Sequence, residues 1–329
     1  MTKVAVIGAG MVGATTAARV AESRIAEEVC LVDVRGDLAH AMALDIGSSL
    51  ALLDSDTRVT GGNDYALAAG ADVVAITAGR PRQPGQSRAD LLNGNAEIIR
   101  SVCGEVRRVA PSAIAIVVTN PLDEMTALAQ LELGFPASRV MGMAGLLDTA
   151  RYRHFLAERA SVDVSRVHGL TLGSHGETMV PLSESATIDG RGALDVLGPA
   201  ALEEVVERTR AGGAEVVRLL QTGSAYWAPS AAVLRMVQAI VLDRQVVLPV
   251  SALLEGQFGI EGVYLGVPAR IGRRGVIEIV EGGLSPREHE ELHAAAREVR
   301  SRVADLVPAE ATPLAPPGSL LDAVRSMLL

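Results

Sequence analysis

The sequence predicts an α/β protein whose first half is a doubly wound parallel sheet and whose second half is a separate α+β domain. The first half alternates short, almost wholly apolar runs with helix-like stretches, which is typical of parallel strands that helices cover on both faces. The second half alternates less regularly and contains a long amphipathic stretch near its end. A chain of 329 residues can bury the cores of two domains, and a hinge at Gly145 gives residues 1–145 and 146–329.

The elements of the two domains follow from these runs. In the first domain we expect strands at residues 4–7, 29–32, 58–60, 73–77, 114–119 and 140–142, and helices at residues 11–23, 38–53, 90–109 and 121–133. In the second domain we expect helices at residues 148–160, 200–221 and 228–243, and strands at residues 246–254, 263–269 and 275–279.

The last long helix has a clear start signal. Ser285 is a favoured N-cap, Pro286 suits the first helical position, and Glu288 can cap in return. Apolar residues then repeat at helical spacing up to residue 306. Residues 308–318 contain four prolines and predict an extended linker to a short amphipathic end at residues 320–329, which is either a subunit contact or a frayed terminus.

Composition and charge exclude several classes of protein. The hydrophobic content of 49% and the charged content of 21% are ordinary for a globular protein, and the net charge of −9 argues against a nucleic-acid partner. No apolar run approaches the ~18 residues of a membrane span. Lys3 is the only lysine, which leaves no good candidate for Schiff-base chemistry. Cys30 and Cys103 form no close motif and are expected to be buried thiols, as in a cytoplasmic protein.

A glycine motif in the first domain predicts a dinucleotide site. Gly8, Gly10 and Gly13 follow an apolar strand and open a helix, which is the context that a Rossmann motif requires. The glycines permit, in order, a tight turn, approach of a pyrophosphate to the backbone, and close packing of helix on strand. Asp33 ends the second strand, where its carboxylate would bind the adenosine ribose and repel a 2′-phosphate. This pattern favours NAD over NADP, although Arg35 nearby weakens that preference.

Three further segments carry charged or titratable side chains. His175 lies between small residues, Asp148 precedes Arg151 by three positions, and the loop from Gly79 holds Arg80, Arg82 and Arg88. Taken alone, such a histidine is more often structural and such arginines are more often solvated. Together with a dinucleotide site they indicate hydride transfer to a small anionic keto acid. No spacing is typical of metal ligands, so no metal is expected.

Six segments in this order resemble the lactate/malate dehydrogenase family, and in particular its lactate-dehydrogenase-like malate dehydrogenase branch. They are the glycine turn, Thr77-Ala78-Gly79, the arginine loop, Val118-Thr119-Asn120-Pro121-Leu122-Asp123, Asp148 with Arg151, and Gly173-Ser174-His175-Gly176. The resemblance covers nearly the whole chain. It implies a Rossmann domain followed by a catalytic domain, with NAD as the cofactor.

The resemblance also implies a role for each matching residue. His175 would be the proton donor and acceptor, Asp148 would orient its imidazole, and Arg151 would grip the substrate carboxylate. Arg88 would polarise the reacting carbonyl, and Asn120 would touch the nicotinamide ribose or the substrate. The cofactor-binding set that the resemblance implies is Gly8, Gly10, Met11, Gly13, Asp33, Thr77, Ala78, Gly79, Asn95, Val118 and Asn120.

Substrate selectivity is expected to rest on Arg82. In the resembling family an amide at this loop position goes with pyruvate and an arginine goes with oxaloacetate. A closed site that held Arg82 against a three-carbon acid would leave a desolvated cation unpaired, at a cost of several kcal/mol. Arg80 is a second cation in the loop and leaves some ambiguity over the partner of the distal carboxylate.

The resulting expectation is a cytoplasmic malate dehydrogenase of the tricarboxylic acid cycle, with malate and oxaloacetate as its substrates. The alternatives are a lactate dehydrogenase, an NAD-dependent glycosidase that would need a metal, and a non-enzymatic protein that merely binds NADH. The resemblance implies self-association, since the helices at residues 38–53 and 228–243 are too apolar for full exposure, and a homotetramer is favoured over a dimer.

Overall fold

The computed structural model describes residues 2–81 and 88–306, without the side chain of Arg88. The expected linker and tail at residues 308–318 and 320–329 therefore lie outside the described residues. The chain forms two compact units. The first contains Met1–Met143, Ala225–Val247 and Arg270–Glu278, and the second contains Ala144–Ser224, Leu248–Ala269 and the chain from Ile279. The chain thus leaves the first unit after Met143, and two later segments return to it.

The sheet of the first unit is parallel and has the order β3-β2-β1-β4-β5-β6. The strands are β1 (Lys3–Ile7), β2 (Glu28–Val32), β3 (Arg58–Gly62), β4 (Val73–Ile76), β5 (Ile114–Val117) and β6 (Val140–Gly142). Ala5 of β1 pairs with Cys30 of β2 and with Val74 of β4, and all three are fully buried. The strand order reverses between β1 and β4, so the carboxyl ends of these strands form the place where this kind of sheet binds ligands. The predicted doubly wound sheet is confirmed.

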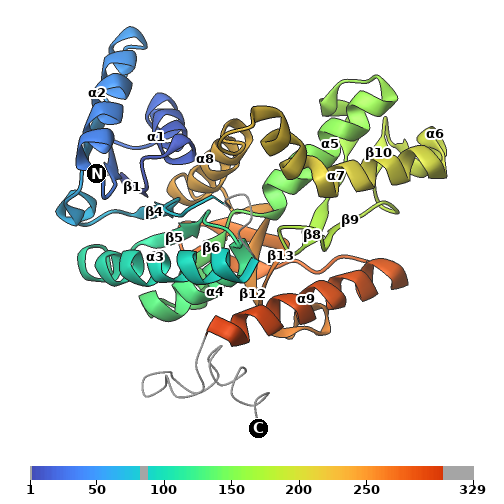
Figure 1. Cartoon of the computed structure of the whole chain (residues 1–329). Coiled ribbons are helices and arrows are strands. Elements are labelled where there is room, and N and C mark those ends of the chain that lie inside the picture. Colours follow the sequence, from blue (N-terminus) through green and yellow to red (C-terminus); the bar gives the residue numbers. More distant parts are fainter. Residues whose placement is uncertain (1, 82–87, 307–329) are drawn as a thin grey trace. The chain divides into compact units, whose positions relative to one another are not determined.

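Helices connect and flank these strands. They are α1 (Met11–Glu22), α2 (Gly36–Leu52), α3 (Arg88–Val109), α4 (Leu122–Leu133) and α8 (Trp227–Val241), with short 3₁₀ turns η1 (Tyr65–Ala68) and η2 (Ala137–Arg139). Helices α3 and α4 run side by side (Figure 1). Helix α8 packs on α1, where Arg19 donates from Nε to the buried Ser230 Oγ at 2.9 Å. This contact explains why a segment late in the sequence belongs to the first unit.

The second unit combines helices with antiparallel strands. Its helical elements are α5 (Gly145–Ala160), η3 (Val164–Arg166), α6 (Ala193–Leu197), α7 (Pro199–Leu220), η4 (Gln257–Gly259) and α9 (Pro286–Leu306). Its main strands are β8 (Thr171–Gly173), β9 (Met179–Pro181), β12 (Val246–Glu255) and β13 (Glu261–Gly272), in the order β12-β13-β8-β9. Strand β14 (Gly275–Ile279) pairs with β13 and belongs almost entirely to the first unit. A small second sheet has the order β11 (Arg191–Gly192), β10 (Thr187–Ile188), β7 (Val167–His168).

A buried cluster lies where α5, α7 and the small sheet meet. It is formed by Tyr152, Leu156, Ala157, Val167, Ala186, Ile188, Ala193, Leu202, Val205 and Val206. The pairing of helix on helix and helix on sheet buries the apolar stripe of α5, which fixes the helix that carries Asp148 and Arg151.

The start of α9 has the predicted capping geometry. The backbone N and the Oγ of Ser285 both donate to Glu288 Oε2 at 3.0 Å, and the Glu288 backbone N lies 3.3 Å from Ser285 Oγ. This reciprocal arrangement satisfies backbone donors that a helix start would otherwise leave unpaired. The expected apolar positions Leu292, Ala296, Val299, Val303 and Leu306 are all buried.

Helix α5 begins at Gly145, three residues before the predicted start. A Cβ atom on Gly145 would lie 3.0 Å from Pro249 Cβ and 3.0 Å from the Thr171 carbonyl oxygen. Close packing inside the second unit therefore explains this glycine, and the helix includes it as its first residue.

Candidate active site

The glycine turn is built by close backbone contacts. Gly8 has a φ of +106°, and its N–H donates to the Val32 carbonyl at 2.7 Å. A Cβ on Gly8 would lie 2.7 Å from the Ala78 nitrogen, and a Cβ on Gly13 would lie 1.8 Å from the Gly8 oxygen. Both positions exclude any larger residue, because the turn, the first helix and the end of β4 touch through their backbones.

Gly10 differs from its two neighbours in the motif. It is exposed, immediately precedes α1, and a Cβ there would meet no atom of the chain within 4 Å. Packing therefore does not explain a glycine at this position. A group that approaches the backbone at the positive end of α1 does explain it, and a pyrophosphate is such a group.

The Asp33 carboxylate is hydrogen-bonded to the backbone of the glycine turn. Its Oδ2 accepts a hydrogen bond from the Ala9 N–H at 2.7 Å, and its Oδ1 accepts from the Arg35 N–H at 2.9 Å. The Arg35 Nε lies 3.5 Å from the same Oδ1. The structural role toward Ala9 was not predicted from the sequence, since the two residues are 24 positions apart.

Side chains that bond to backbone connect the carboxyl end of β4 to those of β1 and β5. Thr77 Oγ1 donates to the Ile7 and Gly8 carbonyls at 3.1 Å each, and Thr119 Oγ1 donates to the Ala78 carbonyl at 2.7 Å. A Cβ on Gly79 would lie 2.7 Å from Thr119 Cγ2. This role of Thr119 was not predicted, although its place at a strand end in a Thr-Asn-Pro segment is the signal that could have found it.

Asn95 lies beneath these strand ends and is 1% exposed. Its Oδ1 accepts from the Arg80 N–H at 2.8 Å, and its Nδ2 donates to the Arg80 and Asn120 carbonyls at 3.1 and 2.7 Å. The side chain thus bridges the arginine loop and the residue after β5. Of the other expected cofactor residues, Met11 and Asn120 are exposed, and Val118 is nearly buried.

The second unit brings Asp148, Arg151 and His175 together. Asp148 and Arg151 lie one turn apart near the start of α5, and His175 lies in the loop between β8 and β9. The imidazole Nδ1 of His175 lies 2.7 Å from Asp148 Oδ2, and the Arg151 Nη1 lies 3.3 Å from Asp148 Oδ1. The Asp148 side chain is 2% exposed, while those of His175 and Arg151 are 15% and 14% exposed. The buried carboxylate of Asp148 thus contacts the guanidinium of Arg151 and the imidazole of His175, and both of these groups are partly exposed.

The loop that carries His175 is short and tied at its base. Gly173 has a φ of +84°, and a Cβ on Gly266 of β13 would lie 2.5 Å from the Gly173 oxygen. The Ser174 and Thr178 hydroxyl oxygens lie 2.6 Å apart across the loop. Gly173 pairs with Met179 in the β8–β9 ladder. Residues 174–178 therefore form a short loop, and His175 is its second residue.

Arg151 also contacts two glycines of α7. A Cβ on Gly212 would lie 3.3 Å from Arg151 Cδ and 3.4 Å from the Phe155 ring, and one on Gly213 would lie 3.7 Å from Arg151 Nη1 and Nη2. The sequence analysis did not single out these glycines, because glycines inside a helical pattern carry no sign of what packs against them.

The remaining predicted site residues are described only in part. Arg82 lies outside the described residues, and Arg88 is described only by its backbone, which begins α3.

Within residues 2–81 and 88–306, no helix is both long and apolar enough to cross a membrane, and no three His, Cys, Asp or Glu side chains are grouped so that they could hold a metal ion.

The two parts of the chain match two models of one family. Residues 2–142 match the lactate/malate dehydrogenase NAD binding domain, and residues 146–309 match the lactate/malate dehydrogenase alpha/beta C-terminal domain. The chain belongs to the lactate/malate dehydrogenase family. The predicted family is therefore confirmed.

The proteins similar to this chain include malate dehydrogenases and a lactate dehydrogenase. Malate dehydrogenase of Chloroherpeton thalassium is 46% identical over 298 residues, which cover 91% of this chain and 96% of that relative. The structure of malate dehydrogenase from Salinibacter ruber has a TM-score of 0.88 at 43% identity and covers 93% of this chain and 97% of its own. Lactate dehydrogenase from Cryptosporidium parvum, complexed with lactic acid and β-nicotinamide adenine dinucleotide, has a TM-score of 0.89 at 38% identity, with 95% and 99% covered. Shared fold therefore does not separate the two substrates within this family, and individual side chains must do so.

Proposed function

We propose that this chain is an NAD-dependent malate dehydrogenase that interconverts (S)-malate and oxaloacetate. The observation that carries the proposal is the cluster in which Asp148 binds both His175 and Arg151. It unites a proton-transfer group with a carboxylate-binding group, as reduction of a keto acid requires. Curated relatives that are 46% and 45% identical and are named malate dehydrogenase support the choice of substrate.

The glycine turn fits the cofactor. Gly10 leaves the backbone open to a pyrophosphate, and Gly8 and Gly13 shape the turn that presents it. The Asp33 carboxylate would accept hydrogen bonds from ribose hydroxyls and repel a 2′-phosphate. Met11, Thr77, Ala78, Gly79, Val118 and Asn120 complete the proposed lining, and Asn95 acts on it by holding the loops. Bound NAD would supply the hydride acceptor of the reaction.

The acid–base work falls to His175. Imidazole changes its charge near neutral pH, so it can give a proton to the carbonyl oxygen in one direction and take it back in the other. The contact of Nδ1 with Asp148 would fix the tautomer, and Nε2 is the nitrogen that would exchange the proton with the substrate. Arg151 would bind the C1 carboxylate through its planar guanidinium.

Arg88 and Arg82 would complete the site. Arg88 would stabilise the negative charge that develops on the reacting oxygen, and removal of one such donor elsewhere costs about 10²–10³ in rate. Arg82 would pair with the C4 carboxylate of oxaloacetate, which pyruvate lacks. Arg82 is thus the proposed basis for malate selectivity.

Initial rates of NADH oxidation with oxaloacetate and with pyruvate, measured side by side, test the proposal. We expect kcat/KM for oxaloacetate to exceed that for pyruvate by about 10²-fold or more, and Arg82→Gln to shift the ratio toward pyruvate. A preference for pyruvate would make the chain a lactate dehydrogenase, like the Cryptosporidium parvum neighbour that is complexed with lactic acid. NADH binding without turnover of either acid would indicate a non-enzymatic role.

We further propose that the protein is a cytoplasmic homotetramer that serves the tricarboxylic acid cycle. Exposed apolar side chains support self-association: Leu44 and Leu52 on α2 and Trp227 on α8 are 59%, 86% and 63% exposed. Cys30 and Cys103 are free and buried, which suits a reducing compartment. Light scattering during gel filtration tests the assembly, and a tetramer has four times the chain mass of 34.2 kDa.

A further inference from the structure

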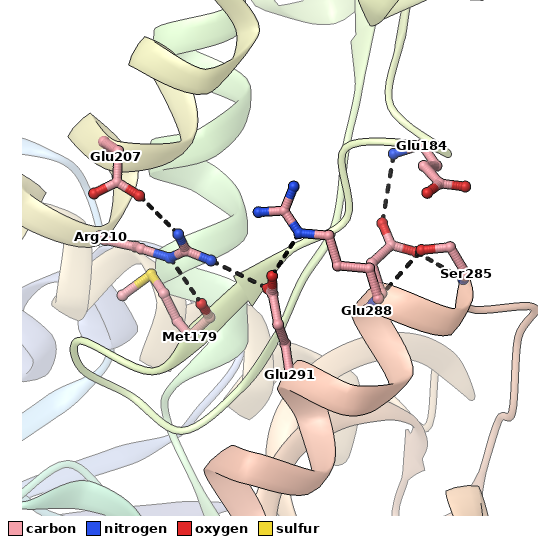
Figure 2. A network of polar contacts seen from close by, with 8 residues as sticks. Met179, Glu184, Glu207, Arg210, Ser285, Glu288 and Glu291 are labelled. Carbon is pink, nitrogen blue, oxygen red and sulfur yellow. Dashed lines mark hydrogen bonds and ion pairs between the residues drawn. The ribbon is translucent and has the colours of Figure 1, made fainter. Parts of the chain in front are cut away.

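Arg210 of α7 connects three elements of the second unit through its three guanidinium nitrogens. Nε donates to the Met179 carbonyl at 3.2 Å, Nη1 binds Glu207 at 2.7 Å, and Nη2 binds Glu291 of α9 at 3.2 Å. Figure 2 shows the guanidinium between these partners. The side chain is 21% exposed, so these bonds are only partly screened by solvent.

The Met179 carbonyl lies at the base of the loop that holds His175. Met179 pairs with Gly173, and its N–H donates to the Gly176 carbonyl at 3.3 Å. Gly176 directly follows His175 in the sequence. The bond from Arg210 therefore holds Met179, the residue that closes this loop. Met179 is in turn hydrogen-bonded to Gly176, the residue next to His175.

The chain that follows β9 is held by α9. The Glu184 N–H donates to Glu288 Oε1 at 3.4 Å, and Glu288 Oε2 is fixed by Ser285 in the capping box (Figure 2). Strand β9 is thus attached to α7 at Met179, and the chain that follows it is attached to α9 at Glu184. Of these attachments, the one made by Arg210 is nearer to His175.

We propose that Arg210 is a positioning residue for His175, in that its bond to the Met179 carbonyl fixes the loop and so the place of the imidazole against Asp148. This inference rests on the proposed function, because it assigns Arg210 to the proton-transfer step of that reaction. Misplacement of a reacting group by about 1 Å can cost 10²-fold in rate, so a side chain that never touches substrate can still control kcat.

Arg287 provides a matched control within the same ionic network. Its Nε donates to Glu291 Oε1 at 2.8 Å, while Arg210 binds the other oxygen of that carboxylate. Arg287→Gln therefore removes the same charge beside the same acid, but it leaves the bond to Met179 in place. If Arg210 acted only as a cation beside Glu291, the two glutamine variants would be equivalent.

The experiment compares full-length wild type, Arg210→Gln, Arg210→Lys and Arg287→Gln. For each, kcat and KM for oxaloacetate are measured, together with the Kd of NADH, the Tm and the isotope effect from NADH deuterated at C4. We expect Arg210→Gln to lower kcat by about tenfold or more, with KM and the Kd of NADH little changed, because an interaction made with the transition state is weakened. Its isotope effect should rise as hydride transfer becomes limiting. Arg287→Gln should keep the wild-type kcat, and Arg210→Lys should recover part of it, since an ammonium can still donate to Met179.

Equal kcat values in Arg210→Gln and Arg287→Gln would overturn the inference, as would a loss in Arg210→Gln that appears wholly in KM. If Arg210→Gln does not fold, Glu291→Gln decides, because it weakens the contact between α7 and α9 and keeps the bond from Arg210 to Met179. A tenfold loss of kcat in that variant would overturn the inference. Absence of turnover in the wild type would overturn the proposed function and this inference with it. Wild-type turnover with equivalent glutamine variants would overturn the inference alone.

Discussion

The Nδ1 atom of His175 lies 2.7 Å from Oδ2 of Asp148, although 27 residues separate the two in the sequence. The carboxylate is almost fully buried, and its other oxygen contacts Arg151. A buried carboxylate must be paired, and here both of its partners are groups that the proposed reaction needs. The pairing orients the imidazole through its Nδ1.

Asp148→Asn tests this relationship. The amide keeps the shape of the side chain but removes the charge, and it no longer selects one tautomer of His175. We expect kcat for oxaloacetate reduction to fall by about 10²-fold or more, in the range of general acid–base contributions. The Kd of NADH, measured by fluorescence titration, should stay unchanged. The exposed acid Asp163, in the same unit, supplies the control Asp163→Asn. A comparable loss in both variants would contradict the assigned role.

Two glycines of the motif allow the effect of packing on stability and the effect of the open backbone on cofactor binding to be measured separately. A Cβ on Gly13 would meet the Gly8 oxygen at 1.8 Å, so Gly13→Ala should destabilise the fold by about 1–3 kcal/mol or more. A Cβ on Gly10 would meet nothing within 4 Å, and its φ of −68° suits alanine. Gly10→Ala should therefore keep the wild-type Tm and weaken NADH binding about tenfold or more, which corresponds to roughly 1.4 kcal/mol.

Thermal unfolding and NADH titration of the two variants check this prediction. A Gly10→Ala protein with wild-type affinity would show that the pyrophosphate does not approach this backbone. An unchanged Tm in Gly13→Ala would show that α1 can move away from the turn.

Sequence alone predicted the elements whose signal is local. The apolar runs gave the parallel sheet, the Ser-Pro-Arg-Glu segment gave the start of α9, and the glycine motif gave the turn before α1. The two-residue strands β7, β10 and β11 and the five-residue α6 were not predicted, because such short segments show no periodicity. Their formation depends on packing against α5 and α7.

The residues that support the candidate site were harder to predict. Asn95 was expected at the cofactor, but its three hydrogen bonds reach the backbone of Arg80 and Asn120. Arg210 meets Met179 across 31 positions, and Gly212 meets Arg151 across α5 and α7. Pairings of this kind depend on the fold, and one sequence holds no pattern that reports them.

The contact of Arg151 with α7 leads to a prediction about substrate binding. A methyl group at Gly212 would lie 3.3 Å from Arg151 Cδ, so Gly212→Ala should displace this side chain by a few tenths of an ångström. We expect KM for oxaloacetate to rise roughly 2- to 10-fold with a smaller change in kcat, given that a full 1 Å can cost about 10²-fold.

Gly213→Ala is the matched control, because its methyl would lie at an ordinary 3.7 Å from the guanidinium. Its KM should stay close to wild type, while the gain in helix propensity of about 1 kcal/mol should raise the Tm. Steady-state kinetics with oxaloacetate distinguish the two variants. If KM rises equally in both, a general stiffening of α7 explains the change better than a displaced Arg151.

The amino end of the parallel sheet contains an ion pair whose contribution to stability depends on pH. Glu28 is 7% exposed, lies 3.2 Å from Lys3 Nζ and binds Arg58. Burial by itself raises the pKa of this carboxyl, but the hydrogen bonds from Arg58 and Lys3 outweigh it and hold the pKa below its usual 4.5. A group whose pKa is lowered by folding stabilises the native state at pH values above its unfolded pKa.

Glu28→Gln should therefore reduce the free energy of unfolding fully at about pH 7, and the difference from wild type should shrink below the unfolded pKa of 4.5, as the carboxyl takes up a proton. Urea unfolding of both proteins at a series of pH values measures the difference. Glu22→Gln, at an exposed acid on α1, should give no such pH dependence. A difference between Glu28→Gln and wild type that is the same at about pH 3.5 and pH 7 would mean that packing of the side chain, and not its charge, stabilises this edge of the sheet.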